Sequence, residues 1–458
     1  MNFYYVEKNI IDPSLSKLLN LNLFSEISFL RSNFKKIITD SLPSSLDIKF
    51  ISETDLLKNK LDMNGIFWCS NIIYTNNEIQ KLFIKKLMKA IFPLIFGDKN
   101  GYIFHGNLLD LKLFLNNESE SKLISLKNEN HLKIILKISD FKAVISENSH
   151  TRHFNEIITD NNNFLKKSQE IEKLESEFIF LKNVPNDLKQ YFVKVFDFNK
   201  GKKIASYSME KLSGVDLSIP LINGSMEARD IKNILDILEH YFLAIKKYKT
   251  NTSFDTLNFI VSKNNDRHAS LKNWKSYGKL DSFINSHTMF AGVNDLVTFS
   301  NKALDKYKSK LRNSNSYFSH GDLCFSNMIF SEENNNITFI DPRGGKDDDA
   351  FRSPYYDLAK ISHSLLGGYD YIINNIAMIQ FDDKMQASIN FNGLMKPDNK
   401  VLFSAFSESL GYNINLIRLV EASLFVSMLP LHTDDEKKVF MLALRASEIL
   451  SHESNRII

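Results

Sequence analysis

The hydrophobic and polar residues follow different periods in different parts of the chain. Over residues 1–135, the short apolar runs "NGIFWCSNIIYT" and "NGYIFHG" stand beside Asn and Gly and predict buried strands. The segment 76–96 instead places its apolar residues near one face of a helix. This mixture predicts a separate N-terminal α/β domain, and the polar stretch 116–133 predicts its boundary.

The pattern changes from about residue 139 onward. "DFKAVIS", "RHFNEIITD" and "NFLKKS" predict three short strands, "SQEIEKLESEFIFLKNV" a helix, and "YFVKVFDF" and "KKIASYSMEKL" two further strands. After residue 225, segments such as "DIKNILDILEHYFLAIKKYK" repeat their apolar residues every three or four positions, which predicts helices. The expected fold class is α+β.

One stretch after the helical region concentrates polar residues. "SHGDLCFSNMIF", residues 319–330, places His320, Asp322 and Asn327 just before a predicted strand. "NMIFS", the turn "EENNN" and "ITFID" predict a hairpin, which would bring Asn327 and Asp341 to its open end. Taken singly, each of these residues also suits an ordinary turn or loop.

Composition and charge narrow the class of protein. The chain has 458 residues, 43% of them apolar and 24% charged, which is typical of a soluble protein of two or three domains. Its 57 basic and 54 acidic residues are well mixed, so neither a nucleic acid nor an anionic membrane is expected as a partner. Two distant cysteines predict no disulfide framework. We expect no signal peptide or membrane span, because the apolar runs are shorter than the ~20 residues that a span needs, and we expect a cytoplasmic location.

The order of elements and motifs resembles a known superfamily. "HGDLCFSN" has the spacing HxDxxxxN, and "IDPRGG" follows the hairpin as the metal-binding motif does in protein kinases. This pattern resembles the aminoglycoside phosphotransferase and choline kinase superfamily. Together with "TRHFN", "LKKS", "YSMEKL" and "YYDLAKISHSLLGGYD", the motifs look more closely like the phosphotransferase-family proteins encoded with bacterial capsule and surface-polysaccharide genes.

The resemblance covers roughly residues 139–458. It implies a protein-kinase-like two-lobed fold, with a small β-rich lobe at 136–212 and a helical lobe with the catalytic loop at 213–458. Some relatives carry an N-terminal sugar-nucleotidyltransferase-like domain, whose glycine- and arginine-rich motif is missing from residues 1–135. A degenerate domain of that kind is one interpretation of this region, whose role is unknown.

The resemblance also implies roles for the polar residues. Asp322 would orient the acceptor hydroxyl and accept its proton. His320, grouped with it in the catalytic loop, would mainly support that loop. Asn327 and Asp341 would supply oxygen ligands to Mg²⁺, a cation that prefers oxygen.

The nucleotide would be held by the β-rich lobe. The resemblance favours Lys167 as the lysine that contacts the phosphates, with Lys166 as the alternative, because strand alternation sends the two side chains to opposite faces. Glu177 would hold this lysine, with Glu175 as a close rival.

Two further contacts to ATP or GTP are implied. The backbone between Glu210 and Leu212 would bind the edge of the base, unless this segment is simply an edge strand. Ser149, in the loop "SENSHT", would offer a hydroxyl or an amide to the phosphates where kinases often use glycine. The acidic residues 347–349 suit a solvated loop or a contact to a cationic acceptor.

The sequence therefore predicts a phosphotransferase with an alcohol group as acceptor. It would transfer the γ-phosphate of ATP or GTP to a sugar, amino sugar or amino alcohol, in capsule or surface-glycan biosynthesis. The alternatives are a bifunctional enzyme with a nucleotidyltransferase-type N-terminal domain, or a non-catalytic kinase-like binding protein.

Overall fold

The chain divides into two compact units, which are described separately. The computed structural model describes residues 2–29, 32–40, 42–59, 63–74, 77–88, 94–116, 124–125, 132–136, 138, 140–141, 144, 155–159, 163–250, 255–345 and 347–454. The first unit comprises Met1–His150 with Asn223–Ser225, and the second comprises Thr151–Ile222 with Met226–Ile458. Both units mix helices and strands, as expected for an α+β chain.

The first unit is built on a six-stranded sheet. Its elements are β1 (Asn2–Glu7), α1 (Pro13–Leu19), η1 (Phe24–Glu26), β2 (Ser28–Phe29), β3 (Ser32–Asn33), α2 (Phe34–Thr39), β4 (Asp47–Ser52), α3 (Glu53–Lys58), β5 (Asn64–Cys69), β6 (Ile72–Tyr74), α4 (Asn77–Met88), β7 (Leu94–Asp98), β8 (Gly101–Asn107), α5 (Leu108–Leu115), β9 (Ile124–Ser125) and β10 (Leu132–Ile134). The strand order is β4-β1-β5-β8-β7-β9, with β1 parallel to both of its neighbours and β8 antiparallel to both of its own.

The predicted strands of this unit are confirmed, and one predicted helix is shorter than expected. "NGIFWCSNIIYT" forms β5 and β6, and "NGYIFHG" lies in β8. The helix expected over 76–96 is α4, and its described part ends at Met88. Leu94, expected on the helical face, begins β7, because β7 pairs with β8 across a tight turn that opposes Asp98 to Gly101. The hairpin therefore draws these apolar residues into the sheet.

The strand predicted at "DFKAVIS" is wrong. Asp140, Phe141 and Val144 are helical. Phe141 and Val144 are both buried, at a spacing of three that puts them on one helical face, whereas a strand would send them to opposite faces. Phe141 packs against Phe34 of the same unit, with ring centres 6.5 Å apart.

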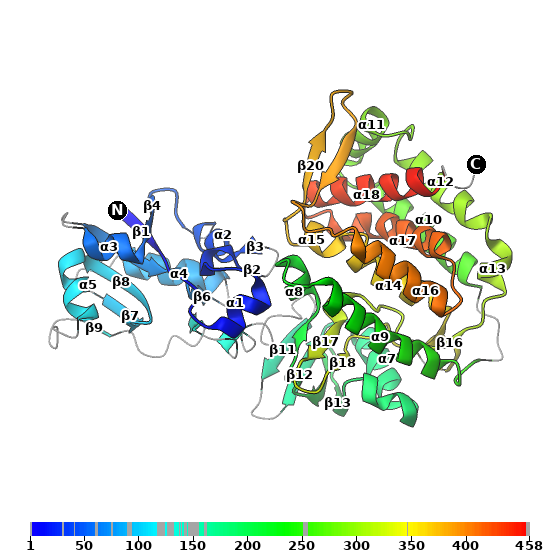
Figure 1. The fold of residues 1–458 in the computed structure, drawn as a ribbon, viewed down its shortest axis with the longest axis horizontal. Coiled ribbons are helices and arrows are strands. Elements are labelled where there is room, and N and C mark those ends of the chain that lie inside the picture. The colour runs from blue at the N-terminus through cyan, green and yellow to red at the C-terminus, as the bar shows by residue number, and fades with distance from the viewer. Residues whose placement is uncertain are drawn as a thin grey trace. The chain divides into compact units, whose positions relative to one another are not determined.

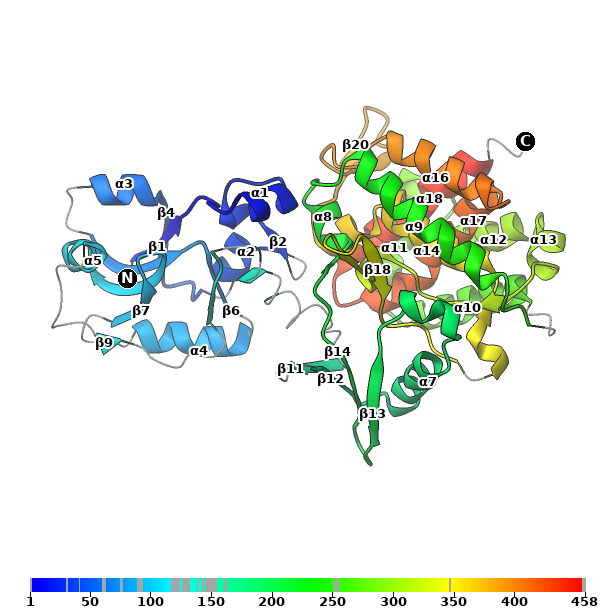
Figure 2. The ribbon, with the colours of Figure 1, turned by 60° about the horizontal axis from the view of Figure 1, so that its bottom comes forward.

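The second unit begins with a β-rich part. Its elements are β11 (Asn155–Thr159), β12 (Asn163–Ser168), α7 (Ile171–Lys182), η2 (Asn186–Tyr191), β13 (Val195–Lys200) and β14 (Ala205–Glu210). The strands form a four-stranded antiparallel sheet in the order β11-β12-β14-β13. Figures 1 and 2 both show this sheet and α7 together on one side of the helices of the same unit. The order of two strands, one helix and two strands matches the sequence prediction apart from its first strand.

The rest of the second unit is mostly helical. Its elements are β15 (Val215–Asp216), α8 (Ser218–Ile222), α9 (Ala228–Ile245), α10 (Thr256–Leu271), α11 (Tyr277–His287), α12 (Val293–Asp305), α13 (Lys308–Arg312), β16 (Tyr317–Phe318), η3 (Phe325–Asn327), β17 (Met328–Ser331), β18 (Asn336–Phe339), η4 (Asp347–Ala350), β19 (Phe351–Arg352), α14 (Pro354–Leu365), α15 (Tyr369–Ile373), β20 (Met378–Phe381), β21 (Ala387–Asn390), α16 (Asp398–Ser409), α17 (Ile414–Met428), η5 (Leu429–His432) and α18 (Glu436–Ser454). The apolar residues that repeat every three or four positions in this segment are buried in α9, namely Ile231, Ile234, Leu235, Leu238, Phe242 and Ile245. The hairpin predicted from "NMIFS" to "ITFID" is β17 and β18.

Helix α17 is the most hydrophobic helix of this part. The segment Ile414–His432 is long and apolar enough to cross a membrane by length and composition, with a mean hydropathy of 1.6. The expectation that no segment reaches that length is therefore not met. The segment is 67% buried inside the protein, as is typical of the core helix of a soluble domain.

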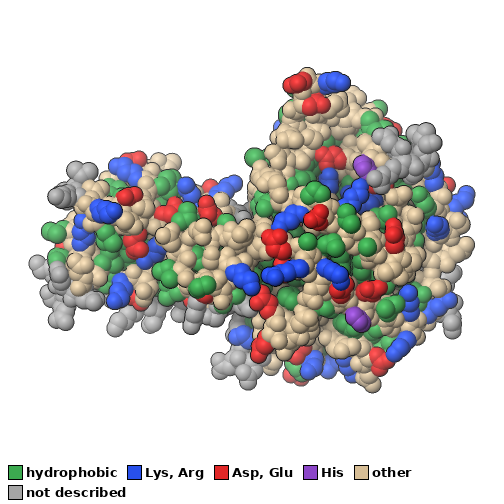
Figure 3. Space-filling view, in the orientation of Figure 1, with side chains coloured by type: hydrophobic (Ala, Val, Ile, Leu, Met, Phe, Trp, Pro, Cys, Tyr) green, Lys and Arg blue, Asp and Glu red, His purple; other side chains and the backbone are tan. Residues whose placement is uncertain are grey.

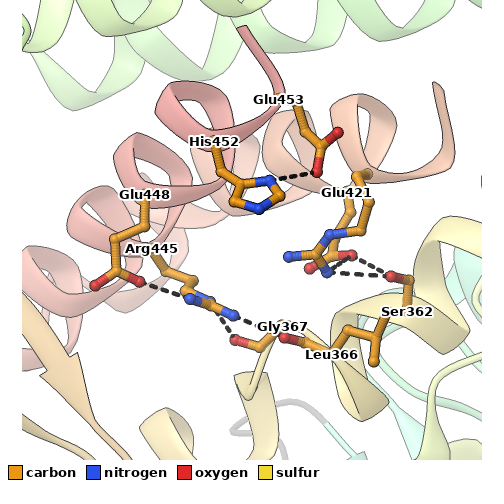
Figure 4. A network of polar contacts seen from close by, with 9 residues as sticks. Ser362, Leu366, Gly367, Glu421, Arg445, Glu448, His452 and Glu453 are labelled. Atoms are coloured by element: carbon orange, nitrogen blue, oxygen red, sulfur yellow. Dashed lines mark hydrogen bonds and ion pairs between the residues drawn. The ribbon is translucent and has the colours of Figure 1, made fainter. Parts of the chain in front are cut away.

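A polar network ties α14, α17 and α18 together (Figure 4). Arg418 donates to Glu421 and to Ser362 of α14, and Ser362 donates to Glu421 as well. Arg445 of α18 donates to the carbonyl oxygens of Leu366 and Gly367, at 2.7 and 2.9 Å. Carbonyls at a helix C-terminus lack partners within the helix, so this arginine completes the end of α14.

We expect Arg418→Ala to destabilise the second unit by about 3–5 kcal/mol, because it leaves the carboxylate of Glu421 buried without its cation. Urea unfolding followed by circular dichroism measures the change. A matched control is Lys232→Ala, which removes one partner of the exposed pair Lys232–Asp236 and is expected to cost less than about 1 kcal/mol. Equal effects of the two substitutions would contradict the role given to Arg418.

Candidate active site

The amine of Lys166 is the centre of the site. Alternation along β12 buries Phe164, Lys166 and Ser168 on one face. The Nζ atom of Lys166 lies 2.6 Å from Oε1 of Glu177 on α7 and 2.7 Å from Oδ1 of Asp341, which follows β18. A single cation thus joins a strand, a helix and the segment after the hairpin.

The structure corrects the choice of lysine. Lys167 lies on the opposite face of β12, where it is half-buried, and Lys166 is the residue that meets Glu177 and Asp341. The sequence alone did not decide between them, because alternation gives two faces without saying which one is covered. Glu175, the rival of Glu177, pairs instead with Lys200 at the edge of the lobe, at 2.6 Å.

Tyr207 is a member of the site that the sequence did not reveal. It lies opposite Lys166 in the pairing of β12 with β14, and its hydroxyl donates to Oε1 of Glu177. The ring centre of Tyr207 lies 5.9 Å from Nζ of Lys166. Burial by itself would lower the pKa of Lys166, but the charges of Asp341 and Glu177 outweigh it and raise that pKa, so the amine stays protonated.

A glycine allows the segment after Asp341 to reach α7. Gly344 has φ of +80°, and a Cβ atom there would lie 2.8 Å from the backbone nitrogen of Glu177. Only a residue without a side chain can pass this close to the helix. Asp341 itself has φ of 54°, in the left-handed region that Asp and Asn tolerate better than most residues. The "DPRGG" motif therefore shapes the turn that delivers Asp341 to Lys166.

His320 supports the catalytic loop from inside. It is fully buried, its Nε2 lies 2.8 Å from the carbonyl oxygen of Ile340, and its Nδ1 accepts a hydrogen bond from the backbone N–H of Asp322 at 3.1 Å. These partners require the neutral ring with its proton on Nε2, and burial lowers the pKa of His320 accordingly. Both ring nitrogens are occupied, so His320, which the prediction grouped with Asp322 as catalytic, is a positioning residue.

One face of α14 braces the same loop. Asp357, which is buried, accepts a hydrogen bond from the backbone N–H of Gly321 at 3.2 Å, and Ser364 accepts one from Phe325 at 3.1 Å. Between them, Nζ of Lys360 lies 2.8 Å from Oδ1 of Asp322. The spacing of three and four positions places these α14 side chains on one helical face.

Lys360 was not singled out from the sequence. The available signal was its spacing from Asp357 and Ser364, which places the three side chains on one face of α14. Burial opposes the charge on Lys360, but the carboxylate of Asp322 outweighs it and raises the pKa of the lysine. Lys360 therefore stays protonated beside the carboxylate of Asp322 across the neutral pH range.

Asn327 and Asp341 lie at the open end of the hairpin, as predicted. Met328 opposes Phe339, and the backbone N–H of Ile340 donates to the carbonyl oxygen of Asn327 at 3.0 Å. The side-chain nitrogen of Asn327 donates to the backbone of Asp322 at 2.8 Å, which turns its amide oxygen the other way. One amide oxygen and one carboxylate fit Mg²⁺, which usually takes few protein ligands alongside phosphate and water. Within the described part of the chain, no group of three or more His, Cys, Asp or Glu side chains suits a metal ion.

The other residues predicted to contact the nucleotide are Glu210, Leu212 and Ser149. The backbone N–H of Glu210 donates to the carbonyl oxygen of Lys194 at 3.0 Å, and the carboxylate of Glu210 accepts from the backbone N–H of Lys194. The N–H of Glu210 is therefore not the donor expected for the nucleotide base. Leu212, just after β14, is half-buried and remains a candidate to contact the base. Ser149 lies outside the described residues.

We expect Gly344→Ala to destabilise the protein by about 1–3 kcal/mol, because φ of +80° and the approach to Glu177 both oppose a side chain. Gly278→Ala is the control, since a Cβ atom there meets nothing within 4 Å and alanine favours helix α11. Thermal unfolding measures both. A rise in melting temperature for Gly344→Ala would show that the close approach is not required.

Comparisons with known proteins were made against families, curated proteins and solved structures. No protein-family model matches the chain. No curated protein matches it either.

The solved structures similar to the chain include aminoglycoside phosphotransferases. One is the apo form of a thermostable mutant of APH(4)-Ia, with 12% identity, a TM-score of 0.43, and 65% of this chain and 94% of that chain covered. A ternary complex of such a mutant with ADP and hygromycin B has 11% identity, a TM-score of 0.40, and coverage of 68% and 97%. The gentamicin complex of APH(2")-IIa has 10% identity, a TM-score of 0.40, and coverage of 69% and 99%. At this distance, what this chain does must be inferred from its own side chains.

Proposed function

We propose that this chain is a nucleotide-dependent phosphotransferase. It transfers the γ-phosphate of ATP or GTP to a hydroxyl group of a small molecule, namely a sugar, an amino sugar or an amino alcohol. The observation that carries the proposal is the buried amine of Lys166 held by both Glu177 and Asp341. Kinase-like phosphoryl transfer needs a lysine–glutamate pair and a metal-binding aspartate brought together in this way.

The biological setting is part of the same proposal. The motifs that resemble phosphotransferases of surface-polysaccharide gene clusters support a role in capsule or surface-glycan assembly. Such an enzyme would work in the cytoplasm, where ATP and GTP are available.

In the reaction, the acceptor hydroxyl approaches the γ-phosphorus in line with the bond to be broken. The carboxylate of Asp322 orients this hydroxyl and takes its proton as the new oxygen–phosphorus bond forms. The bond between the γ-phosphorus and the bridging oxygen breaks, and the nucleoside diphosphate leaves with that electron pair. His320 and Asp357 fix the loop that presents Asp322.

The other residues act on the phosphates. The amine of Lys166 contacts phosphate oxygens from the β-rich lobe while Glu177, to which Tyr207 donates, holds it in place. Asn327 and Asp341 would hold Mg²⁺, which when bound neutralises the charge of the β- and γ-phosphates. Lys360 fixes the direction of the Asp322 carboxylate through their ion pair.

Lys166→Met is expected to raise the Kd for a Mg-nucleotide at least about tenfold, because a hydrogen bond to a charged group contributes roughly 1.5–3 kcal/mol. Lys167→Met is the matched control and is expected to change the Kd less than about twofold, since its side chain lies on the other face of β12. Isothermal titration calorimetry gives both values. The assignment fails if Lys167→Met is the substitution that loses binding.

Asp322→Asn is expected to lower kcat by about 10²–10⁴-fold while the protein still binds Mg-nucleotide, because it removes the proton acceptor. The measurement is release of nucleoside diphosphate across a panel of sugars, amino sugars and amino alcohols. Asp305→Asn, an exposed aspartate at the end of α12, serves as the control. Undiminished turnover by Asp322→Asn would rule out the proposed role.

A further inference from the structure

Four cationic side chains gather around Phe259 and Tyr356 on the helical side of the site. We call Lys263, Arg343, Arg352 and Lys360 the basic cluster. Lys360 pairs with Asp322, as described above. Lys263, on α10, lies 2.7 Å from the hydroxyl of Tyr356, the residue one turn before Lys360 on α14.

Two of these cations share one aromatic ring. The guanidinium carbons of Arg343 and Arg352 lie 5.4 and 5.8 Å from the ring centre of Phe259 on α10. The ring of Phe259 in turn lies 5.7 Å from that of Tyr356. A common aromatic core therefore holds cations from α10, from the "DPRGG" segment and from β19.

The cations act on one another and on Tyr356. Burial is the main cause that lowers the pKa of Lys263, and the nearby charges of Arg343 and Lys360 lower it further. Burial raises the pKa of the Tyr356 hydroxyl, yet Lys263, Lys360 and Arg343 together outweigh it and lower that pKa. Cations that lie close enough to lower the pKa of a neighbouring lysine repel one another, which is unfavourable for folding. Such an arrangement is typical of a site that binds an anion.

The acidic side chains near the cluster are largely committed. Asp322 faces Lys360, and Asp357 is held by the backbone of Gly321. Asp349 is exposed and its charge acts on Arg352. Among the side chains that the structure describes, which leave out those of residues 346–348, no carboxylate lies within ion-pair distance of Lys263 or Arg343. The surface shown in Figure 3 mixes both signs of charge.

We propose that the basic cluster binds an anionic group on the acceptor, so that the acceptor is a hydroxyl compound bearing a phosphate or a carboxylate, such as a sugar phosphate or a sugar acid. This inference rests on the proposed function and narrows its acceptor class. It disfavours the amino sugars and amino alcohols that an acidic acceptor pocket would select.

The basic cluster belongs to a different part of the unit from Lys166, the lysine proposed to contact the nucleotide. The charges that act most on Lys166 are Asp341 and Glu177, whereas those that act on Lys360 are Asp322 and Tyr356. Lys166 belongs to the β-rich part, and Lys263 and Lys360 belong to α10 and α14 of the helical part. An acceptor whose hydroxyl meets Asp322 would therefore extend its anionic group toward Lys263 and Arg343. Lys263 contacts Tyr356, one turn before Lys360, and the side chain of Arg343 lies beside Gly321, the residue before Asp322, so both cations can pair with that group.

The test uses inorganic phosphate as the probe. The full chain is first saturated with a non-hydrolysable Mg-nucleotide analogue, so that phosphate cannot occupy the nucleotide site, and phosphate is then titrated by calorimetry. We expect binding to the unmodified chain, and a Kd at least about tenfold higher in the double variant Lys263→Gln with Arg343→Gln. The single variant Arg343→Lys, in which Lys263 is unchanged and the positive charge at position 343 is retained, is expected to keep most of the affinity for phosphate. Lys302→Gln, an exposed cation on α12, is the control and should leave the Kd unchanged.

Each result has one meaning. Absence of phosphate binding, or equal binding by the double variant and the Lys302 control, overturns the inference. If the analogue does not bind but phosphate does and the double variant loses it, the anion site stands and the proposed nucleotide function fails. If the analogue binds and phosphate does not, the function stands and the anionic acceptor is wrong.

Matched acceptors then identify the anion. D-Glucose 6-phosphate, D-glucuronate and D-glucosamine are each compared with D-glucose by kcat/KM. We expect kcat/KM to be higher for D-glucose 6-phosphate or D-glucuronate than for D-glucose. In the double variant, the ratio of these two kcat/KM values is expected to fall about tenfold. The phosphate and the acid arms distinguish the two sources of charge, and a preference for D-glucosamine would contradict the inference.

Discussion

The site depends on one buried amine that must remain charged. Lys166 lies in the interior, where an ammonium group is costly unless it is paired, and two carboxylates from distant parts of the sequence supply the pairing. Glu177 comes from α7 and Asp341 from the end of the hairpin, so the pairing also fixes these elements with respect to β12. The close passage of Gly344 past α7 follows from the same constraint, because Asp341 reaches the amine only if the segment after it lies against the helix.

Helix α14 carries a second constraint through the unit. Its Asp357, Lys360 and Ser364 contact three successive parts of the catalytic loop. Its far end is held by the contacts of Arg445 to the carbonyl oxygens of Leu366 and Gly367. Lys360 of the same helix belongs to the basic cluster, and Tyr356 contacts its Lys263. One helix therefore sets the position of Asp322 and of the cations beside it.

The sequence predicted the parts of this arrangement that depend on short-range pattern. The hairpin and the 3–4 repeat of α9 were predicted because their residues are neighbours on one strand pair or one helix. The choice between Lys166 and Lys167, and the roles of Tyr207 and Lys360, depend on which faces are covered by elements far away in the chain. The strand expected at "DFKAVIS" was wrong for a similar reason. Its apolar residues suit either element, and Phe141 takes the helical form by packing on Phe34.

The contacts of α18 bear on the order in which the protein matures. The ribosome releases the catalytic loop, the hairpin and α14 well before α18, yet Arg445 is the residue that closes the end of α14. A nascent chain that has just exposed Asp322 thus has the side chains of the candidate site but not the helix that closes the end of α14. A chain interrupted before α18 would carry Lys166, Asp322 and Asp341 without the contacts that Arg445 makes to α14.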